Sequence, residues 1–241
     1  MNFWWYVLLF GFPFAGGLIG WFIKKHNPAH LKLFLAFSGA FLFSVTIISL
    51  IPELYHHHET DGIKVGYLIL GGFFLQILID VFSGGVEHGH VHRHTENVSL
   101  RVFLALAVHA FLEGMAGGSG FFETHAQHSF LWGIALHEVP AAFALMVVLK
   151  SENTSSKWLL PIAALYALMT PAGAYLADHA GVFATNAEHL IPYIVAVVIG
   201  VFLHISTTIL FENSEHHRFS FYKIIAVLMG ASVAILSGGL H

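Results

Sequence analysis

Residues 99–118 read SLRVFLALAVHAFLEGMAGG, and residues 129–149 read SFLWGIALHEVPAAFALMVVL. Each stretch is long and apolar enough to cross a bilayer as a helix, which takes about 20 mostly apolar residues. Each also carries a histidine and a glutamate near its middle: His109, Glu113, His137 and Glu138. A charged side chain at the centre of a bilayer costs about 2.5–3.5 kcal/mol on insertion scales. Four ionisable groups at this depth predict a compensating partner, and a bound cation is the simplest one.

The composition agrees with a membrane protein. Of the 241 residues, 56% are hydrophobic and only 10% are charged, whereas soluble domains have about 25% charged residues. The chain has no cysteine, so any metal site must use nitrogen and oxygen ligands. A net charge of −4 without a basic patch argues against a nucleic-acid partner. We therefore expect an all-α, polytopic protein embedded in the lipid bilayer.

The apolar pattern predicts eight membrane-spanning helices in a single transmembrane domain, residues 1–241. The predicted spans are, approximately, residues 3–23, 31–52, 64–83, 99–118, 129–149, 157–177, 190–211 and 220–239. The first apolar stretch is too long for a signal peptide and has no basic segment before it, so we expect it to remain in the mature chain.

The basic residues predict the orientation of the spans. Nine of the ten Lys and Arg fall in or beside the odd-numbered connections, and only Lys64 falls in an even-numbered one. Cytoplasmic loops carry an excess of Lys and Arg. We therefore expect a multi-pass protein of the cell membrane, the cytoplasmic membrane in a bacterium, with both termini outside.

A weak internal repeat relates the two ends of the chain. Residues 13–17 (PFAGG) resemble residues 171–174 (PAGA), and residues 39–42 (GAFL) resemble residues 200–203 (GVFL). Each later segment crosses the membrane in the opposite direction from its earlier counterpart. Inverted repeats are typical of secondary transporters, whose sites lie near the midplane. The pattern predicts a 3+2+3 arrangement in which the fourth and fifth spans carry the ligands.

The spacing of the four ionisable residues predicts one shared site. At a rise of about 1.5 Å per residue, His109 and His137 both lie about 12–15 Å deep in antiparallel helices. His109 and Glu113 are four residues apart and share a helix face. Glu138 is turned by about 100° from His137, so it either completes the ligand set or contacts a second position. The alternative interpretation is a set of interhelical hydrogen bonds, worth about 1 kcal/mol each.

Three motifs resemble the ZIP (Zrt/Irt-like) family of metal-ion transporters. Residues 109–114 (HAFLEG) are similar to the fourth-helix pattern His-Asn-x-x-Asp/Glu-Gly, and residues 137–141 (HEVPA) are similar to the fifth-helix pattern His-Glu-x-Pro-x-Glu. Residues 50–53 (LIPE) resemble the end of the family's second helix, although Ser49 replaces a histidine there. The resemblance extends to the eight spans and to the histidine-rich third connection.

The resemblance implies uptake of divalent zinc, iron or manganese into the cytoplasm, with the ion as bound substrate. It also implies a homodimer and an elevator-like movement of the first, fourth, fifth and sixth helices against the others. The chain departs from the family pattern at Ala110, Ala141 and Thr170, where many members have metal ligands. We therefore expect one dominant ion instead of two, in a mixed nitrogen and oxygen site that suits Zn²⁺ or Fe²⁺.

Further polar residues are candidates for the transport pathway or for a second metal-binding region. Candidates for the pathway are Glu53, Asp80, His204 and Glu212. For His204 a hydrogen bond between helices is an equally good interpretation. The predicted cytoplasmic loop, residues 84–98, contains an alternating series that fits a weak metal relay or sensor: Glu87, His88, His90, His92 and His94. An ordinary solvated loop is the alternative.

Two other function classes compete with transport. An intramembrane metalloprotease requires a second histidine four residues after the first, but the residue four positions after His137 is Ala141. A histidine-box oxygenase requires many imidazoles at one membrane face, whereas most histidines here are in separate loops. We therefore expect that the chain is not an enzyme. A metal-responsive receptor with little flux is the remaining alternative.

Overall fold

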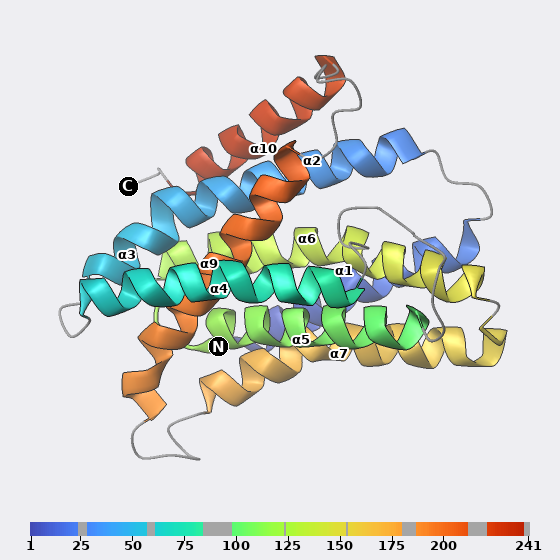
Figure 1. Cartoon of the computed structure of the whole chain (residues 1–241), viewed down its shortest axis with the longest axis horizontal. Helices are drawn as coiled ribbons and strands as arrows, with labels where there is room; N and C mark the ends of the chain where they lie inside the picture. Colours follow the sequence, from blue (N-terminus) through green and yellow to red (C-terminus); the bar gives the residue numbers. More distant parts are fainter. Residues whose placement is uncertain are drawn as a thin grey trace.

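The computed structural model describes residues 1–23, 28–56, 61–83, 98–122, 124–152, 154–179, 187–211 and 221–238. Every regular element in these ranges is helical, and Figure 1 shows the helices as a bundle of long rods. In chain order they are α1 (Phe3–Phe22), α2 (Pro28–Val45), the π-helical turn η1 (Thr46–Leu50), α3 (Ile51–His56), α4 (Gly62–Ser83), α5 (Val98–Gly118), α6 (Thr124–Ser151), α7 (Ser156–Asp178), α9 (Ala187–Phe211) and α10 (Phe221–Gly238).

Most of these helices have the length and composition of membrane spans. Within the described ranges, seven helices are long and apolar enough to cross a bilayer when residues 31–56 are counted as one. The eighth predicted span corresponds to α10, whose 18 residues reach about 27 Å at 1.5 Å per residue. This is slightly less than the hydrocarbon thickness of about 30 Å. The prediction of an all-α polytopic fold is confirmed.

The second span continues past the residue where we expected it to end. Pro52 was expected at its terminus, yet the helix extends through α3 to His56. The backbone widens just before the proline, where the N–H of Ile51 bonds to the carbonyl of Thr46. A proline is tolerated in the first turn of a helix because its missing N–H is not needed there. The π-helical turn thus allows the helix to restart at Ile51.

Four helices form what we call the site bundle: α1, α5, α6 and α7. The backbones of α5 and α7 touch, since a methyl group on Gly114 would overlap the carbonyl of Thr170 and one on Gly173 would overlap the carbonyl of Phe111. Gly16 places α1 equally close to Val139 of α6. Small residues allow such close approach of membrane helices, which are held by van der Waals packing.

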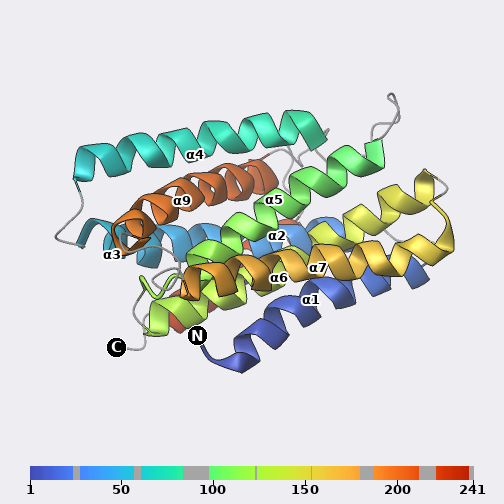
Figure 2. The ribbon, with the colours of Figure 1, turned by 90° about the horizontal axis from the view of Figure 1, so that it is seen from below.

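The remaining helices form the flanking bundle: α2 with η1 and α3, α4, α9 and α10. Gly72 of α4 and Gly200 of α9 pack directly on each other's helix backbones, and Gly230 of α10 packs on the carbonyl of Phe37 in α2. Figure 2 shows α4 and α9 on one side of the molecule and α1 with α7 on the other. The chain therefore folds into two groups of closely packed helices.

The two bundles meet through side chains. Phe130 of α6 packs edge-on against Phe202 of α9, with ring centroids 5.3 Å apart. Gly133 of α6 faces the ring of Phe41 in α2. Some of the described glycines pack on a backbone carbonyl of another helix, and in each case the two helices belong to the same bundle. The contact between bundles is thus mainly a layer of apolar side chains, with one hydrogen bond from the Ser129 hydroxyl of α6 to the carbonyl of Ser237 in α10. The contacts within each bundle include backbone on backbone.

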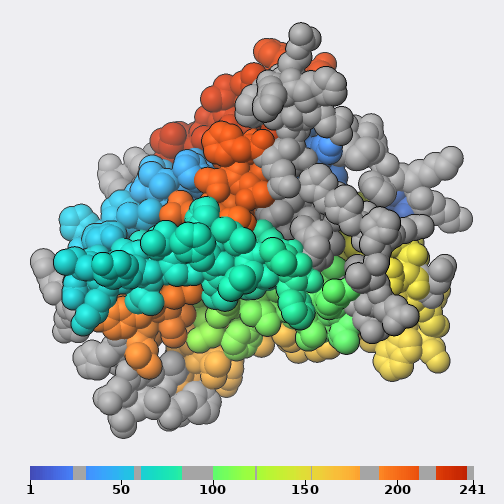
Figure 3. Space-filling view, in the orientation of Figure 1, coloured from blue at the N-terminus to red at the C-terminus, as the bar shows by residue number. Residues whose placement is uncertain are grey.

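Large apolar side chains cover the outer surface of the flanking bundle. Figure 3 shows α4 lying across one face of the molecule. Its outward side chains include Tyr67, Leu78 and Val81, which are 70%, 67% and 77% exposed. Such a surface would be unfavourable in water but suits contact with lipid chains.

Candidate metal centre

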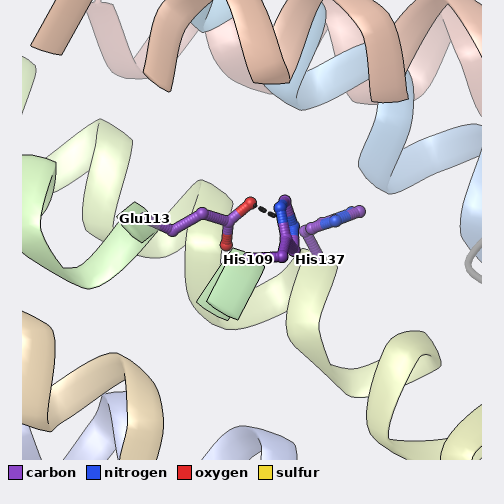
Figure 4. Close-up of side chains that lie close together, drawn as sticks. All are labelled: His109, Glu113 and His137. Carbon is purple, nitrogen blue, oxygen red and sulfur yellow. Dashed lines mark ion pairs between the residues drawn. The ribbon is translucent and has the colours of Figure 1, made fainter. Parts of the chain in front are cut away.

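The hairpin of α5 and α6 brings three of the predicted ligands together. Gln127 at the start of α6 donates to the carbonyl of Gly117 at the end of α5, 3.0 Å away, so the two helices run in opposite directions. One ligand atom each from His109, Glu113 and His137 lies within 4.8 Å of the other two. All three residues are buried. Figure 4 shows Glu113 reaching toward the ring of His109, with His137 beside it on the neighbouring helix.

The donors converge without satisfying each other. Nε2 of His109 lies 2.7 Å from Oε1 of Glu113, and both side chains are completely buried. Neither atom has a hydrogen-bond partner of good geometry among the described residues, and Oε2 of Glu113 has none either, although the carboxyl group of Glu138 lies within hydrogen-bonding reach of that of Glu113. The rings of His109 and His137 stand nearly perpendicular, at 83°, with centroids 5.8 Å apart. Buried polar groups normally have partners, so this arrangement is typical of ligands directed at a common ion.

Glu138 is buried beside this group but lies outside it. Its side chain accepts a hydrogen bond from the hydroxyl of Tyr166 on α7, and only 1% of the residue is exposed. Its carboxyl group is close enough to interact with the carboxyl group of Glu113 and with the ring of His109. It is not among the three residues whose ligand atoms converge. Its position next to His137 in the chain, about 100° around the helix, accounts for this separation.

The donor set suits a divalent cation of borderline softness. Imidazole nitrogen and carboxylate oxygen are both common ligands of zinc and of other first-row metals. Two buried carboxylates carry a charge that one dication neutralises, which lowers the high electrostatic cost of burying them. The arrangement can therefore hold a metal ion in a region where an isolated charge would be unfavourable.

Comparison with known proteins identifies the family. The model of the ZIP zinc transporter family matches residues 87–238, more than half of the chain. The chain belongs to the ZIP family. A protein from Akkermansia muciniphila named zinc transporter ZupT is 26% identical over 247 residues, which cover 92% of this chain and 91% of that protein. This chain is thus a multi-pass member of a family of divalent metal transporters.

Three residues near the centre differ from the metal ligands of the ZIP pattern. Ala110 of α5 and Ala141 of α6 are buried, 0% and 4% exposed, and offer no ligand atom. Thr170 of α7 is also fully buried, and its hydroxyl has no hydrogen-bond partner among the described residues. These are the three positions where the sequence departs from the pattern of many ZIP members. The centre therefore presents one cluster of three charged or imidazole ligands within the described ranges.

Two of the predicted pathway residues pair with each other. Nε2 of His204 on α9 lies 2.7 Å from Oδ2 of Asp80 on α4, and the amide of Gln76 donates to Oδ1 of Asp80 at 2.9 Å. The ring of His204 also packs edge-on against Phe73. This cluster connects two helices of the flanking bundle, apart from the three-residue group, and agrees with the interhelical interpretation of His204.

The other predicted residues are not brought to the centre. Glu53 lies in the short helix α3, near the end of the second span. The remaining predicted residues fall outside the described ranges: Glu212 and the loop residues Glu87, His88, His90, His92 and His94.

Sequence reasoning missed Tyr166. A tyrosine in an apolar helix is common, and its contact with Glu138 joins α7 to α6, 28 residues apart in the chain. One signal was available: Tyr166 is four residues before Thr170, on the helix face that the ZIP pattern directs at the metal. The hydroxyl of a buried tyrosine usually finds a polar partner.

Proposed function

We propose that this chain carries a divalent metal ion, Zn²⁺ in the first place and Fe²⁺ or Mn²⁺ as further substrates, into the cytoplasm. The ion is held by His109, Glu113 and His137. The single observation that carries the proposal is the convergence of these three buried side chains within 4.8 Å in a transporter-family chain. The name of the ZupT relative, a zinc transporter, supports zinc as the first substrate to test.

The proposed direction rests on the distribution of basic side chains. Nζ of Lys150 at the end of α6 donates to the carbonyls of Gly20, Trp21 and Ile23, at 3.1, 2.9 and 3.1 Å. Lys150 thus lies at the same end of the bundle as the first connection of the chain. This supports a common basic face, which the positive-inside rule assigns to the cytoplasm. Both termini then lie outside the cell membrane.

The packing of the two bundles supports an elevator-type movement. The site bundle, α1, α5, α6 and α7, holds all three proposed ligands and is packed backbone on backbone. Its contact with the flanking bundle consists mainly of apolar side chains, with one hydrogen bond from Ser129 to Ser237, and apolar side chains can slide past one another more easily than interlocked backbones. We therefore propose that the site bundle moves as a unit with its ion. The homodimer implied by the family resemblance remains a prediction, which mass measurement in nanodiscs would test.

The test is metal uptake into proteoliposomes. Wild-type protein is expected to accumulate Zn²⁺, and His109→Ala and His137→Ala are expected to lose both uptake and binding. Glu152→Gln, an exposed site at the end of α6, is the control and should leave both unchanged. Tight binding of Zn²⁺ by the wild type without uptake of any of the three ions would contradict transport and favour a metal-responsive receptor.

A further inference from the structure

Tyr166 contacts the centre from a helix that contributes no ligand to the three-residue group. It is among the largest fully buried side chains, 1% exposed. Its hydroxyl donates to Oε2 of Glu138, whose residue follows the proposed ligand His137. α7 is positioned by the backbone contacts of Gly114 and Gly173 with α5, described above. The hydroxyl is therefore held by a rigid helix pair, not by a loop.

The hydrogen bond decides where the charge of Glu138 lies. Oε1 of Glu138 is buried and makes no hydrogen bond of good geometry among the described residues, and the Glu138 carboxyl group lies within hydrogen-bonding reach of that of Glu113. The carboxyl group is near Glu113 and His109, yet it is not in the group whose atoms converge. A glutamate side chain has several rotatable bonds, so a short turn about them would carry an unrestrained carboxylate toward an ion in the centre. The bond to Tyr166 opposes that movement.

We propose that Tyr166 is a positioning residue that holds the Glu138 carboxylate back from the ion. This inference rests on the proposed function of the centre. The ion then has three protein ligands and an open coordination position, while Glu138 supplies compensating charge without direct ligation. Zinc sites that exchange their fourth ligand have this arrangement, whereas closed four-ligand sites are structural. A carrier must release its ion, and a restrained fourth carboxylate keeps binding from becoming too tight.

The test is removal of the hydroxyl by Tyr166→Phe. In purified protein, we expect Glu138 to join the ligand set and the Kd for Zn²⁺ to fall about tenfold, the change that corresponds to about 1.4 kcal/mol of added binding free energy. In proteoliposomes, Vmax should fall together with KM because the ion is released more slowly. With Co²⁺ as the probe, the visible absorption should change because one protein ligand is added. Unchanged or weaker binding with an unchanged Co²⁺ spectrum would overturn the proposal.

A second variant tests the same proposal independently of how Tyr166→Phe folds. Glu138→Gln keeps an oxygen that accepts the bond from Tyr166 but removes the negative charge. If Glu138 is not a ligand, the Co²⁺ spectrum of this variant should match that of the wild type. A changed spectrum would mean that Glu138 ligates the ion already, against the proposal. In the Glu138→Gln background, Tyr166→Phe should have no further effect on affinity.

The controls separate this inference from the proposed function. Tyr175→Phe removes a hydroxyl from the same helix at a side chain that is 54% exposed, and it should leave the affinity and the spectrum unchanged. His109→Ala removes a proposed ligand. If His109→Ala binds Zn²⁺ as tightly as the wild type, the proposed centre itself is wrong. If His109→Ala abolishes binding and Tyr166→Phe changes nothing, only the role of Tyr166 is wrong.

Discussion

Glu113→Gln is expected to have opposite effects on metal binding and on the stability of the metal-free protein. Two unit charges 4 Å apart interact by about 4 kcal/mol at an effective dielectric constant of 20, so a dication and a carboxylate gain about 8 kcal/mol. Desolvation offsets several kcal/mol of this. We estimate a net loss of about 3–5 kcal/mol, which raises the Kd for Zn²⁺ by a factor of at least about 100.

The same substitution should stabilise the protein when no metal is bound. The side chain of Glu113 is completely buried, has no hydrogen bond of good geometry among the described residues and is close to the carboxyl group of Glu138. A carboxamide of the same size keeps the polar atoms but removes the charge that burial and the second carboxyl group disfavour. We therefore expect the free energy of unfolding to rise by about 1–3 kcal/mol.

Thermal unfolding in detergent, with EDTA or with Zn²⁺, measures both effects. Wild type should be stabilised strongly by Zn²⁺ because the ion binds only the folded state. Glu113→Gln should have the higher Tm in EDTA and little response to Zn²⁺, while the exposed control Glu152→Gln should behave as the wild type. A variant that is less stable than the wild type in EDTA and still responds fully to Zn²⁺ would refute the reasoning and favour a structural hydrogen-bond set.

Three further substitutions test contacts within the two bundles. Gly114→Ala forces α5 and α7 apart and should lower the free energy of unfolding by about 1–3 kcal/mol and weaken Zn²⁺ binding; Gly71→Ala, at a glycine with open space around it, is the control, and equal binding by both variants would contradict the proposed contact. His204→Ala removes a partner of Asp80 and should cost about 1–3 kcal/mol of stability, with Zn²⁺ affinity unchanged; lost uptake at unchanged stability would instead favour the pathway interpretation. Lys150→Met removes three hydrogen bonds to the carbonyls at the end of α1. It should lower the free energy of unfolding by about 1–2 kcal/mol, and therefore the Tm, without changing the Kd for Zn²⁺. An unchanged Tm would show that these hydrogen bonds contribute little to stability.

The spans could be predicted from sequence because hydrocarbon acts on each helix separately. About 20 apolar residues must satisfy their backbone hydrogen bonds within one segment, so the pattern is local. α5 was expected at residues 99–118 and is observed at Val98–Gly118. The second span was expected to end near residue 52, whereas a π-helical turn before Pro52 lets the helix continue to His56. The inverted repeat and the orientation in the membrane remain predictions.

The centre could be predicted only in part. His109 and Glu113 are four residues apart on one helix, which places them on one face whatever the rest of the chain does. That His137 joins them required the assumption that α5 and α6 are antiparallel neighbours at the same depth, and the structure places them so. Glu138 was expected either to complete the ligand set or to contact a second position, and its contact with Tyr166 depends on the position of α7.

The sequence alone determined the membrane class, the helices and the kinds of ligand atom, because these follow from the hydrophobicity, periodicity and chemistry of neighbouring residues. Only the tertiary structure decided which helices pack backbone on backbone, that Asp80 pairs with His204, and that Tyr166 contacts Glu138. The physical reason is that these contacts join residues that are far apart in the chain, by 28 and 124 positions for the two side-chain contacts. The distances between these residues depend on how the helices pack, and the sequence pattern within each helix does not determine that packing.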